Sequence, residues 1–203
     1  MISALVLSAA VFVVDGQVNV KALTQQKAVK NALTKLLKEG PPQLKPFLAE
    51  IGFNPLRDLD RVRFRMTQSV DKNEPGNPLF ILDGRFAPKR IHSSWAKNKK
   101  KTRIEAKKIA GKTSYEGRPN APMFAIDSKN RVYAGHKSVV TKAIKKQLPE
   151  LRKVPPFLRG AKVWFRFRTT AEARRHILKE QQASPLAEIH EIQARAGLMG
   201  RDV

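Results

Sequence analysis

Cysteine is absent from the 203-residue chain, and aromatic residues make up only 7% of it. The first absence excludes disulfides, thiolate chemistry and cysteine-ligated zinc or iron–sulfur sites, and it leaves the cellular compartment open. Acidic residues are also scarce, with 17 Asp and Glu against 40 Lys and Arg, so the formal net charge is +23. So large an excess of one sign favours a polyanionic partner or an anionic surface.

Long hydrophobic runs are missing as well. The apolar stretch at residues 1–14 (MISALVLSAAVFVV) is shorter than a membrane-spanning helix and ends at Asp15. It also lacks the basic residues that begin a secretory signal, since the first lysine is Lys21. We therefore predict a strand here, with an atypical signal as the alternative. No transmembrane segment is expected, and the protein is predicted to be cytoplasmic, with export as the alternative.

Residues 51–66 (IGFNPLRDLDRVRFRM) contain the clearest local pattern in the chain. Asn54 is a good helix N-cap, and Pro55 fits the first helical position, where its missing N–H has no consequence. From residue 61 to 66 basic and apolar residues alternate. This alternation predicts a strand with its apolar face on a core and its arginine face in water or on a polyanion. Residues 163–168 (VWFRFR) repeat the pattern.

Turn signals and hydrophobic periodicity divide the rest of the chain. Asp15-Gly16 lies between two apolar-rich runs and predicts a β-hairpin. Further strands are expected at 79–86, 109–115, 122–126 and 131–135, and helices at 21–38, 44–51, from Pro88, at 138–147, at 170–182 and at 184–197.

These elements predict an α+β fold, with a mainly antiparallel sheet, helices packed on one face of it, and C-terminal helices. Proline residues near position 155 divide it into two parts. Residues 1–153 are expected to form an α+β domain with a basic middle segment. Residues 154–203 would add a strand and two helices that pack on this domain or extend to a partner.

The positive charge is concentrated in the middle of the chain. Residues 91–160 contain 18 basic and 4 acidic residues, a net charge of +14, whereas residues 1–40, 41–90 and 161–203 each carry only +3. The densest tract comprises Lys97, Lys99, Lys100, Lys101, Arg103, Lys107 and Lys108. Such a tract can contact phosphates without base specificity, or it can simply be a solvated loop.

The alternating strands suggest a second basic surface. One face of the first strand carries Arg61, Arg63 and Arg65, and one face of the second carries Trp164, Arg166 and Arg168. If the two strands are neighbours in one sheet, five arginines and an indole line a single surface. Arginines bind phosphates and an indole can stack on a base, although an ordinary polar outer face is the alternative.

No motif for catalysis or cofactor binding is present. The histidines, at 92, 136, 176 and 190, have no metal-ligand spacing, and there is no glycine-rich phosphate loop and no nucleophile elbow. We therefore predict that the protein is not an enzyme and that it has no catalytic residues, cofactor or metal.

Three stretches resemble a family of uncharacterised bacterial proteins that is common in planctomycete-type genomes. They are GFNPLRDLDRV, GRFAPKRI and YEGRPNAPMFAIDSKNRVYAGHKSVVTKAI, and they occur in this order over about residues 52–145. The resemblance implies an α+β fold without a catalytic site, and members of the family often look exported. It supplies no ligand.

Together these features predict a non-enzymatic basic protein that binds nucleic acid mainly through phosphates, with RNA or a ribonucleoprotein favoured. The C-terminal helices would contact other proteins. The alternative is an envelope-associated or scaffold protein that binds anionic lipid or polysaccharide.

Overall fold

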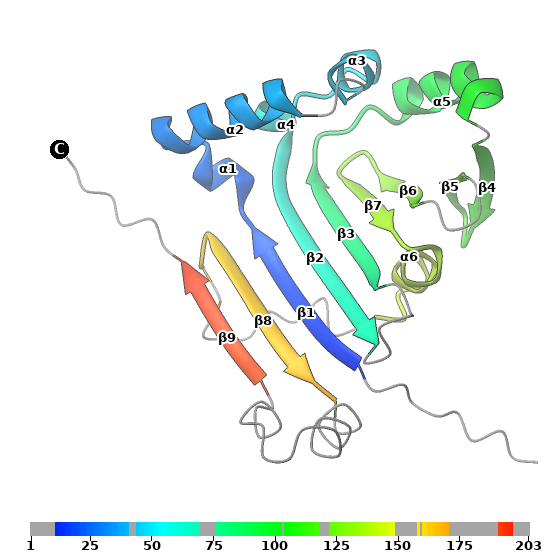
Figure 1. The fold of residues 1–203 in the computed structure, drawn as a ribbon. Helices are drawn as coiled ribbons and strands as arrows, with labels where there is room; N and C mark the ends of the chain where they lie inside the picture. The colour runs from blue at the N-terminus through cyan, green and yellow to red at the C-terminus, as the bar shows by residue number, and fades with distance from the viewer. Residues whose placement is uncertain are drawn as a thin grey trace, which may run out of the picture.

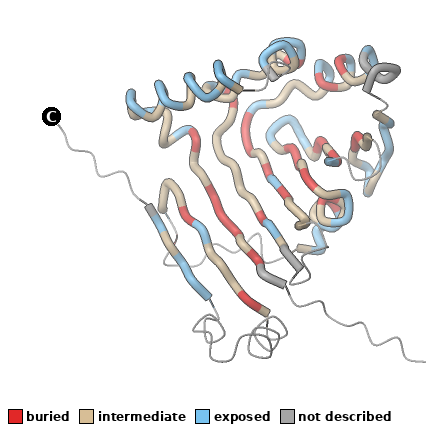
Figure 2. The backbone as a smooth tube through the Cα atoms, viewed as in Figure 1, coloured by how far each residue is buried: buried red, intermediate tan, exposed pale blue. Residues whose placement is uncertain are grey.

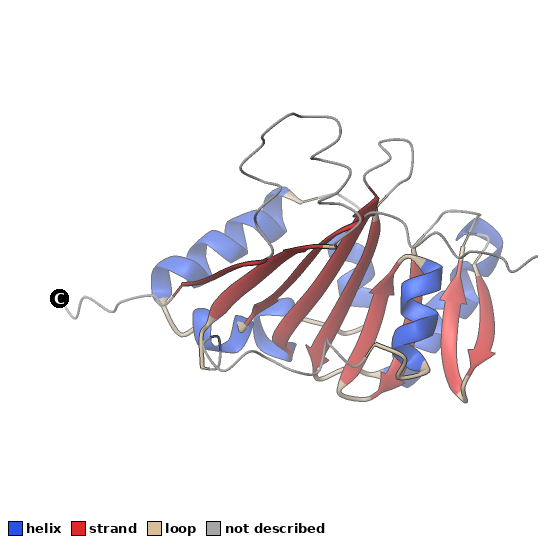
Figure 3. Cartoon of the chain, turned by 90° about the horizontal axis from the view of Figure 1, so that it is seen from below, coloured by secondary structure: helices blue, strands red, loops and turns tan. Residues whose placement is uncertain are grey.

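The fold is built on one large antiparallel sheet (Figure 1). The computed structural model describes residues 11–40, 44–69, 76–102, 104–117, 122–148, 158, 160–170 and 191–196. In these ranges nine strands are hydrogen-bonded in the order β4-β5-β6-β7-β3-β2-β1-β8-β9. The strands twist strongly across the sheet, which Figure 3 shows from below. The antiparallel sheet and the mixed α+β class are thus confirmed.

The strands lie at β1 Val11–Val18, β2 Leu59–Ser69, β3 Asn77–Gly84, β4 Glu105–Ile109, β5 Lys112–Glu116, β6 Met123–Ser128, β7 Arg131–Gly135, β8 Val163–Thr169 and β9 Glu191–Ala196. The helices lie at α1 Val20–Leu23, α2 Lys27–Glu39, α3 Leu44–Glu50, α4 Pro55–Asp58, α5 Pro88–Thr102 and α6 Lys137–Ile144. No helix in the described ranges is long and apolar enough to span a membrane.

Helices pack on both faces of the sheet, which corrects the prediction of one covered face. On one face Val140 and Ile144 of α6 pack against Ile81 and its neighbours. On the other face Ile91 of α5 packs against Val132 of β7, with Leu82 beside them. Because successive strand residues point to opposite faces, Ile81 and Leu82 lie on different sides. The strands β3, β6 and β7 are apolar on both sides, and so each side needs a cover.

The Asp15-Gly16 pair lies inside β1 and does not form the predicted hairpin. The strand continues unbroken from Val11 to Val18 and pairs along its length with β2 on one side and β8 on the other. A turn at this point would break both ladders. Gly16 has a packing role instead, because a Cβ there would overlap the Phe64 ring of the neighbouring strand.

Three other predicted elements are divided or replaced in the structure. The expected 21–38 helix is split into α1 and α2, and the expected 109–115 strand contains the turn between β4 and β5 at Ala110-Gly111. The end of the expected 184–197 helix is β9, which pairs with β8 and places Ile192 beside Phe167. The expected helix at 170–182 lies outside the described residues, apart from Thr170.

Burial is greatest in the central strands, whereas α2 and β9 are largely exposed (Figure 2). The predicted start of α4 is confirmed, since the Asn54 side chain accepts a hydrogen bond from Leu56 N and Pro55 occupies the first helical position. This short turn leads directly into β2, and its last residue, Asp58, accepts a backbone hydrogen bond from Arg85 just beyond β3.

Candidate functional site

The predicted arginine and tryptophan residues share one face of the sheet, but β1 lies between their two strands. Asp15 pairs with Arg65 on one side and with Arg166 on the other. One row along, Gln17 lies between Arg63 and Trp164. Directly opposed residues of antiparallel strands point to the same face, and so these side chains surround β1 on one side of the sheet.

This face is the buried one, which corrects the expected polarity of β2 and β8. Arg65 is 8% exposed and Trp164 is 6% exposed. On the opposite face Met66 is 44% exposed and Phe165 is 46% exposed. The predicted alternation is present, but the charged side chains point inward, where Asp15 and Asp83 are buried with them.

Asp15 is the acidic partner in the middle of the sheet, where it is 2% exposed. Its Oδ2 lies 3.0 Å from the Arg166 guanidinium and 2.6 Å from that of Arg168. Its Oδ1 lies 3.5 Å from Arg65 Nε. One carboxylate therefore holds guanidiniums from the two strands that flank β1.

Asp83 forms a similar cluster at the end of β3. It pairs with Arg61 at 3.2 Å, with Arg63 at 3.0 Å and with Arg131 at 2.6 Å. Burial lowers the pKa of Arg63, and the two neighbouring guanidiniums act in the same direction, whereas Asp83 opposes them. These arginines connect β2, β3 and β7, and Arg61 keeps 43% of its side chain exposed.

The basic tract is divided between a helix and an edge strand. Lys97 is exposed on α5, and Lys107 and Lys108 are exposed on β4. The backbone of residues 99–101 lies in α5, their side chains are not described, and Arg103 lies outside the described residues. The sequence tract is thus carried by two adjoining elements.

These two elements belong to a larger region that we call the basic end, residues 88–148, comprising α5, β4 to β7 and α6 (Figure 1). It contains 17 basic and 3 acidic residues, a net charge of +14. The three acids are each paired with lysine: Glu105 and Glu116 with Lys107, Glu116 also with Lys137, and Asp127 with Lys112. Among the described side chains, its other exposed cations are Lys89, Arg90, Lys97, Lys108, Lys129, Lys142, Lys145 and Lys146.

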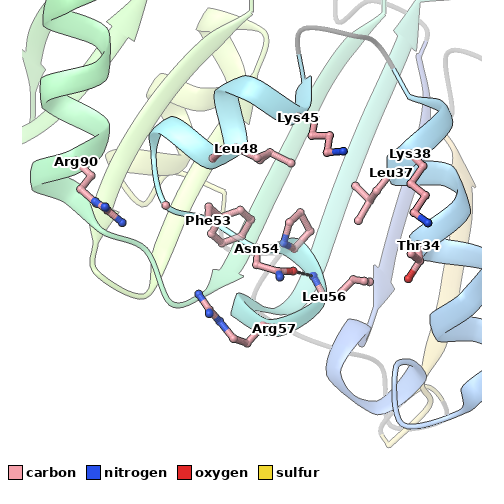
Figure 4. A pocket seen from close by; sticks show the side chains of 13 residues that line it. Thr34, Leu37, Lys38, Lys45, Leu48, Phe53, Asn54, Leu56, Arg57 and Arg90 are labelled. Carbon is pink, nitrogen blue, oxygen red and sulfur yellow. Dashed lines mark hydrogen bonds between the residues drawn. The ribbon is translucent and has the colours of Figure 1, made fainter.

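An open cavity of about 560 Å³ lies between α2, α3, α4 and the start of α5 (Figure 4). Apolar side chains form much of its wall, among them Leu37, Leu48, Phe53, Pro55 and Leu56. Four cations also line it, and no carboxylate belongs to the described wall. These cations are Lys38, Lys45, Arg57 and Arg90.

A second cavity, of about 450 Å³, lies beside the Asp83 cluster and is much more polar. Its wall contains three aspartates and three arginines, so the two charges balance. Nowhere in the described ranges do three His, Asp or Glu side chains gather where they could hold a metal ion.

Among the histidines, His92 contacts the Tyr115 hydroxyl through Nδ1. Burial lowers the pKa of His92, and nearby Lys108 adds to the effect. Burial also raises the pKa of Tyr115, so its hydroxyl stays protonated and can donate to the neutral imidazole. The contact joins α5 to β5, which favours a structural role. His136 bonds Ser138 Oγ at 2.9 Å, and His176 and His190 lie outside the described residues.

This contact predicts a loss of stability at mildly acidic pH. The pKa of His92 in the folded protein is below that of the unfolded chain, about 6.5, so the unfolded state takes up more protons as the pH falls. The stabilising effect is complete above pH 6.5 and is lost as the pH falls through the folded value. The free energy of unfolding, measured with urea at pH 7.5 and at pH 5.5, should differ less between the two pH values in His92→Gln than in the unmodified protein.

The pKa values of Asp58 and Glu116 are also lowered, chiefly by hydrogen bonds from Arg57 and Lys137. Their effect on stability is lost only near and below pH 4, outside this window. An equal pH dependence in His92→Gln and the unmodified protein would show that His92 does not contribute.

Comparison of the chain with protein-family models, with curated proteins and with solved structures found no match.

Proposed function

We propose that this is a non-enzymatic basic protein that binds nucleic acid, with RNA favoured, mainly through its phosphates. The observation that carries the proposal is the basic end, a continuous stretch of sequence with a net charge of +14 whose four strands form one end of the sheet. Most of its exposed lysines have no carboxylate partner among the described residues. Uncompensated charge of this density attracts a polyanion and releases its counterions.

The contacts assigned to phosphates are those of the exposed lysines. Lys97, Lys107 and Lys108 project from α5 and the edge strand β4, where a strand of nucleic acid can approach. Lysine contacts at loose spacing position a backbone without reading bases. The arginines of β2 and β8 pair with Asp15 and Asp83, and we assign them a structural role. Of these arginines only Arg61 and Arg168 are partly open to a ligand.

The salt dependence of binding tests this assignment. In a variant with Lys97→Gln, Lys107→Gln and Lys108→Gln, we expect weaker binding of single-stranded RNA. The slope of log affinity against log salt should fall in magnitude by about 2, because each lost phosphate contact removes about 0.7. The measurement is fluorescence anisotropy of a labelled twelve-nucleotide RNA over a series of salt concentrations.

A matched control carries Lys21→Gln, Lys27→Gln and Lys30→Gln on α1 and α2, on another part of the molecule (Figure 1). It removes the same charge and should leave the slope nearly unchanged. Equal effects of the two variants would show that net charge, and not the basic end, governs binding. An affinity that does not depend on salt, or binding to anionic vesicles but not to RNA, would overturn the proposal.

A further inference from the structure

The cavity between α2, α3, α4 and α5 has the size of a small-ligand site, since such sites usually measure about 300–1,000 Å³. Its position also connects it to the basic end. Arg90, in the first turn of α5, lines the cavity, and Lys97 is exposed further along the same helix. A ligand that leaves the cavity along α5 would therefore meet the lysines assigned above to phosphates.

The cations of the cavity are arranged in two groups with apolar side chains between them (Figure 4). Lys38 and Lys45 lie at one end, and Arg57 and Arg90 lie at the other. Arg57 is paired with Asp58, but Lys38, Lys45 and Arg90 have no ion-pair partner in the part of the chain that the structure describes. The arrangement suits a ligand with an apolar centre and a negative group on each side.

Phe53 supplies a rigid aromatic surface between the two groups of cations. Its ring stacks on Phe86 with a centroid distance of 5.0 Å and an interplanar angle of 11°. Phe86 is not part of the cavity wall, whereas Phe53 is. One face of the Phe53 ring is thus covered by Phe86, and Phe53 also belongs to the cavity wall, where a flat group can lie against it.

The backbone at Gly52 leaves room for the Arg90 guanidinium. Gly52 has a φ of +67°, and a Cβ at this position would overlap the Arg90 guanidinium. A larger residue would be strained there and would push the arginine away from the cavity. The position of Arg90 in the cavity wall therefore depends on the loop that contains Gly52.

We propose that this cavity holds one unstacked nucleotide of a single-stranded nucleic acid. The base lies against Phe53, and the phosphates on its two sides contact Lys38 with Lys45 and Arg57 with Arg90. A base between two phosphates has the required order of charges, whereas an acyl chain with one head group leaves one pair of cations without a partner. Aromatic platforms flanked by cations are how many proteins bind single strands. This inference rests on the proposed function.

The test compares single-stranded and duplex RNA of twelve nucleotides as anisotropy probes. Phe53→Leu keeps an apolar side chain but removes the stacking surface, and it should weaken single-strand binding about tenfold. It should leave duplex binding unchanged, because the bases of a duplex are already stacked. Thermal unfolding of the variant shows whether the pair with Phe86 is needed for folding.

A second variant does not touch the core. Lys38→Gln with Lys45→Gln alters exposed side chains only, and it should weaken single-strand binding more than duplex binding. Lys27→Gln with Lys30→Gln is the control, since these lysines belong to α2, as Lys38 does, but not to the cavity wall. The control should weaken both probes equally or not at all.

The outcomes separate this inference from the proposed function. If the ratio of the affinities for single-stranded and duplex RNA is unchanged in both cavity variants, the nucleotide site is overturned. Phosphate binding by the basic end would be unaffected by that result. Failure of the unmodified protein to bind either probe would overturn both. If AMP displaces the single strand at an equal nucleotide concentration, the cavity binds a free nucleotide and the proposal that it binds a nucleotide of a strand is wrong.

Discussion

Replacing Asp15 with asparagine is expected to lower the free energy of unfolding by about 3–5 kcal/mol. Asparagine has nearly the shape of aspartate, so packing around the 2%-exposed side chain is kept. What is lost is the negative charge that Arg166 and Arg168 contact at 3.0 Å and 2.6 Å. Removing one member of a buried ion cluster leaves the other charges desolvated and without compensation, which is why the cost is large.

Urea unfolding of Asp15→Asn and of a control variant, Glu39→Gln, measures this effect. Glu39 forms an exposed pair with Lys35 at i,i+4 spacing, and its loss should change the free energy of unfolding by less than about 0.5 kcal/mol. A change below about 1 kcal/mol in Asp15→Asn would mean that water already screens the cluster. The double variant Asp15→Asn, Arg168→Gln should be less destabilised than the sum of its two single variants.

Local features of the fold could be predicted from the sequence. The cap at Asn54 and the alternation of β2 depend on neighbouring residues alone, and both are present in the structure. The buried side of β2 could not be predicted in this way, because it depends on distant partners. Arg65 meets Asp15 from β1, fifty positions earlier, and the same carboxylate binds Arg168 from β8.

Asp15 also shows how one signal can have two causes. A carboxylate beside glycine in an apolar run favours a turn, and the hairpin was predicted for that reason. The same carboxylate can be the counterion of a buried cluster, which requires arginines on adjacent strands.

The cavity could not be predicted from any local sequence pattern. Lys38, Phe53 and Arg90 come from three separate parts of the chain, and only the packing of α2, α3 and α5 brings them together.

Substitution of Trp164 tests whether its indole packs inside the protein or stacks on a base, as the sequence predicted. Its side chain is 6% exposed, on the same face as Asp15, and its Nε1 has no hydrogen-bond partner in the described structure. Trp164→Ala should therefore lower the free energy of unfolding by about 3–5 kcal/mol, because it leaves a large cavity. Trp164→Phe should cost less than about 1.5 kcal/mol, since it keeps most of the apolar contact and leaves no partner unbonded.

Fluorescence distinguishes the two accounts in the folded protein. Trp95→Phe leaves Trp164 as the single indole, because the chain contains two tryptophans. If Trp164 is an internal packing residue, saturating single-stranded RNA should leave its emission unchanged, and Trp164→Phe should bind RNA as tightly as the unmodified protein. Quenching on binding, together with a stable Trp164→Ala variant that binds more weakly, would place the indole against a base. The burial of Trp164 favours the first result, because a base could reach a ring that is 6% exposed only if the groups that cover it moved aside.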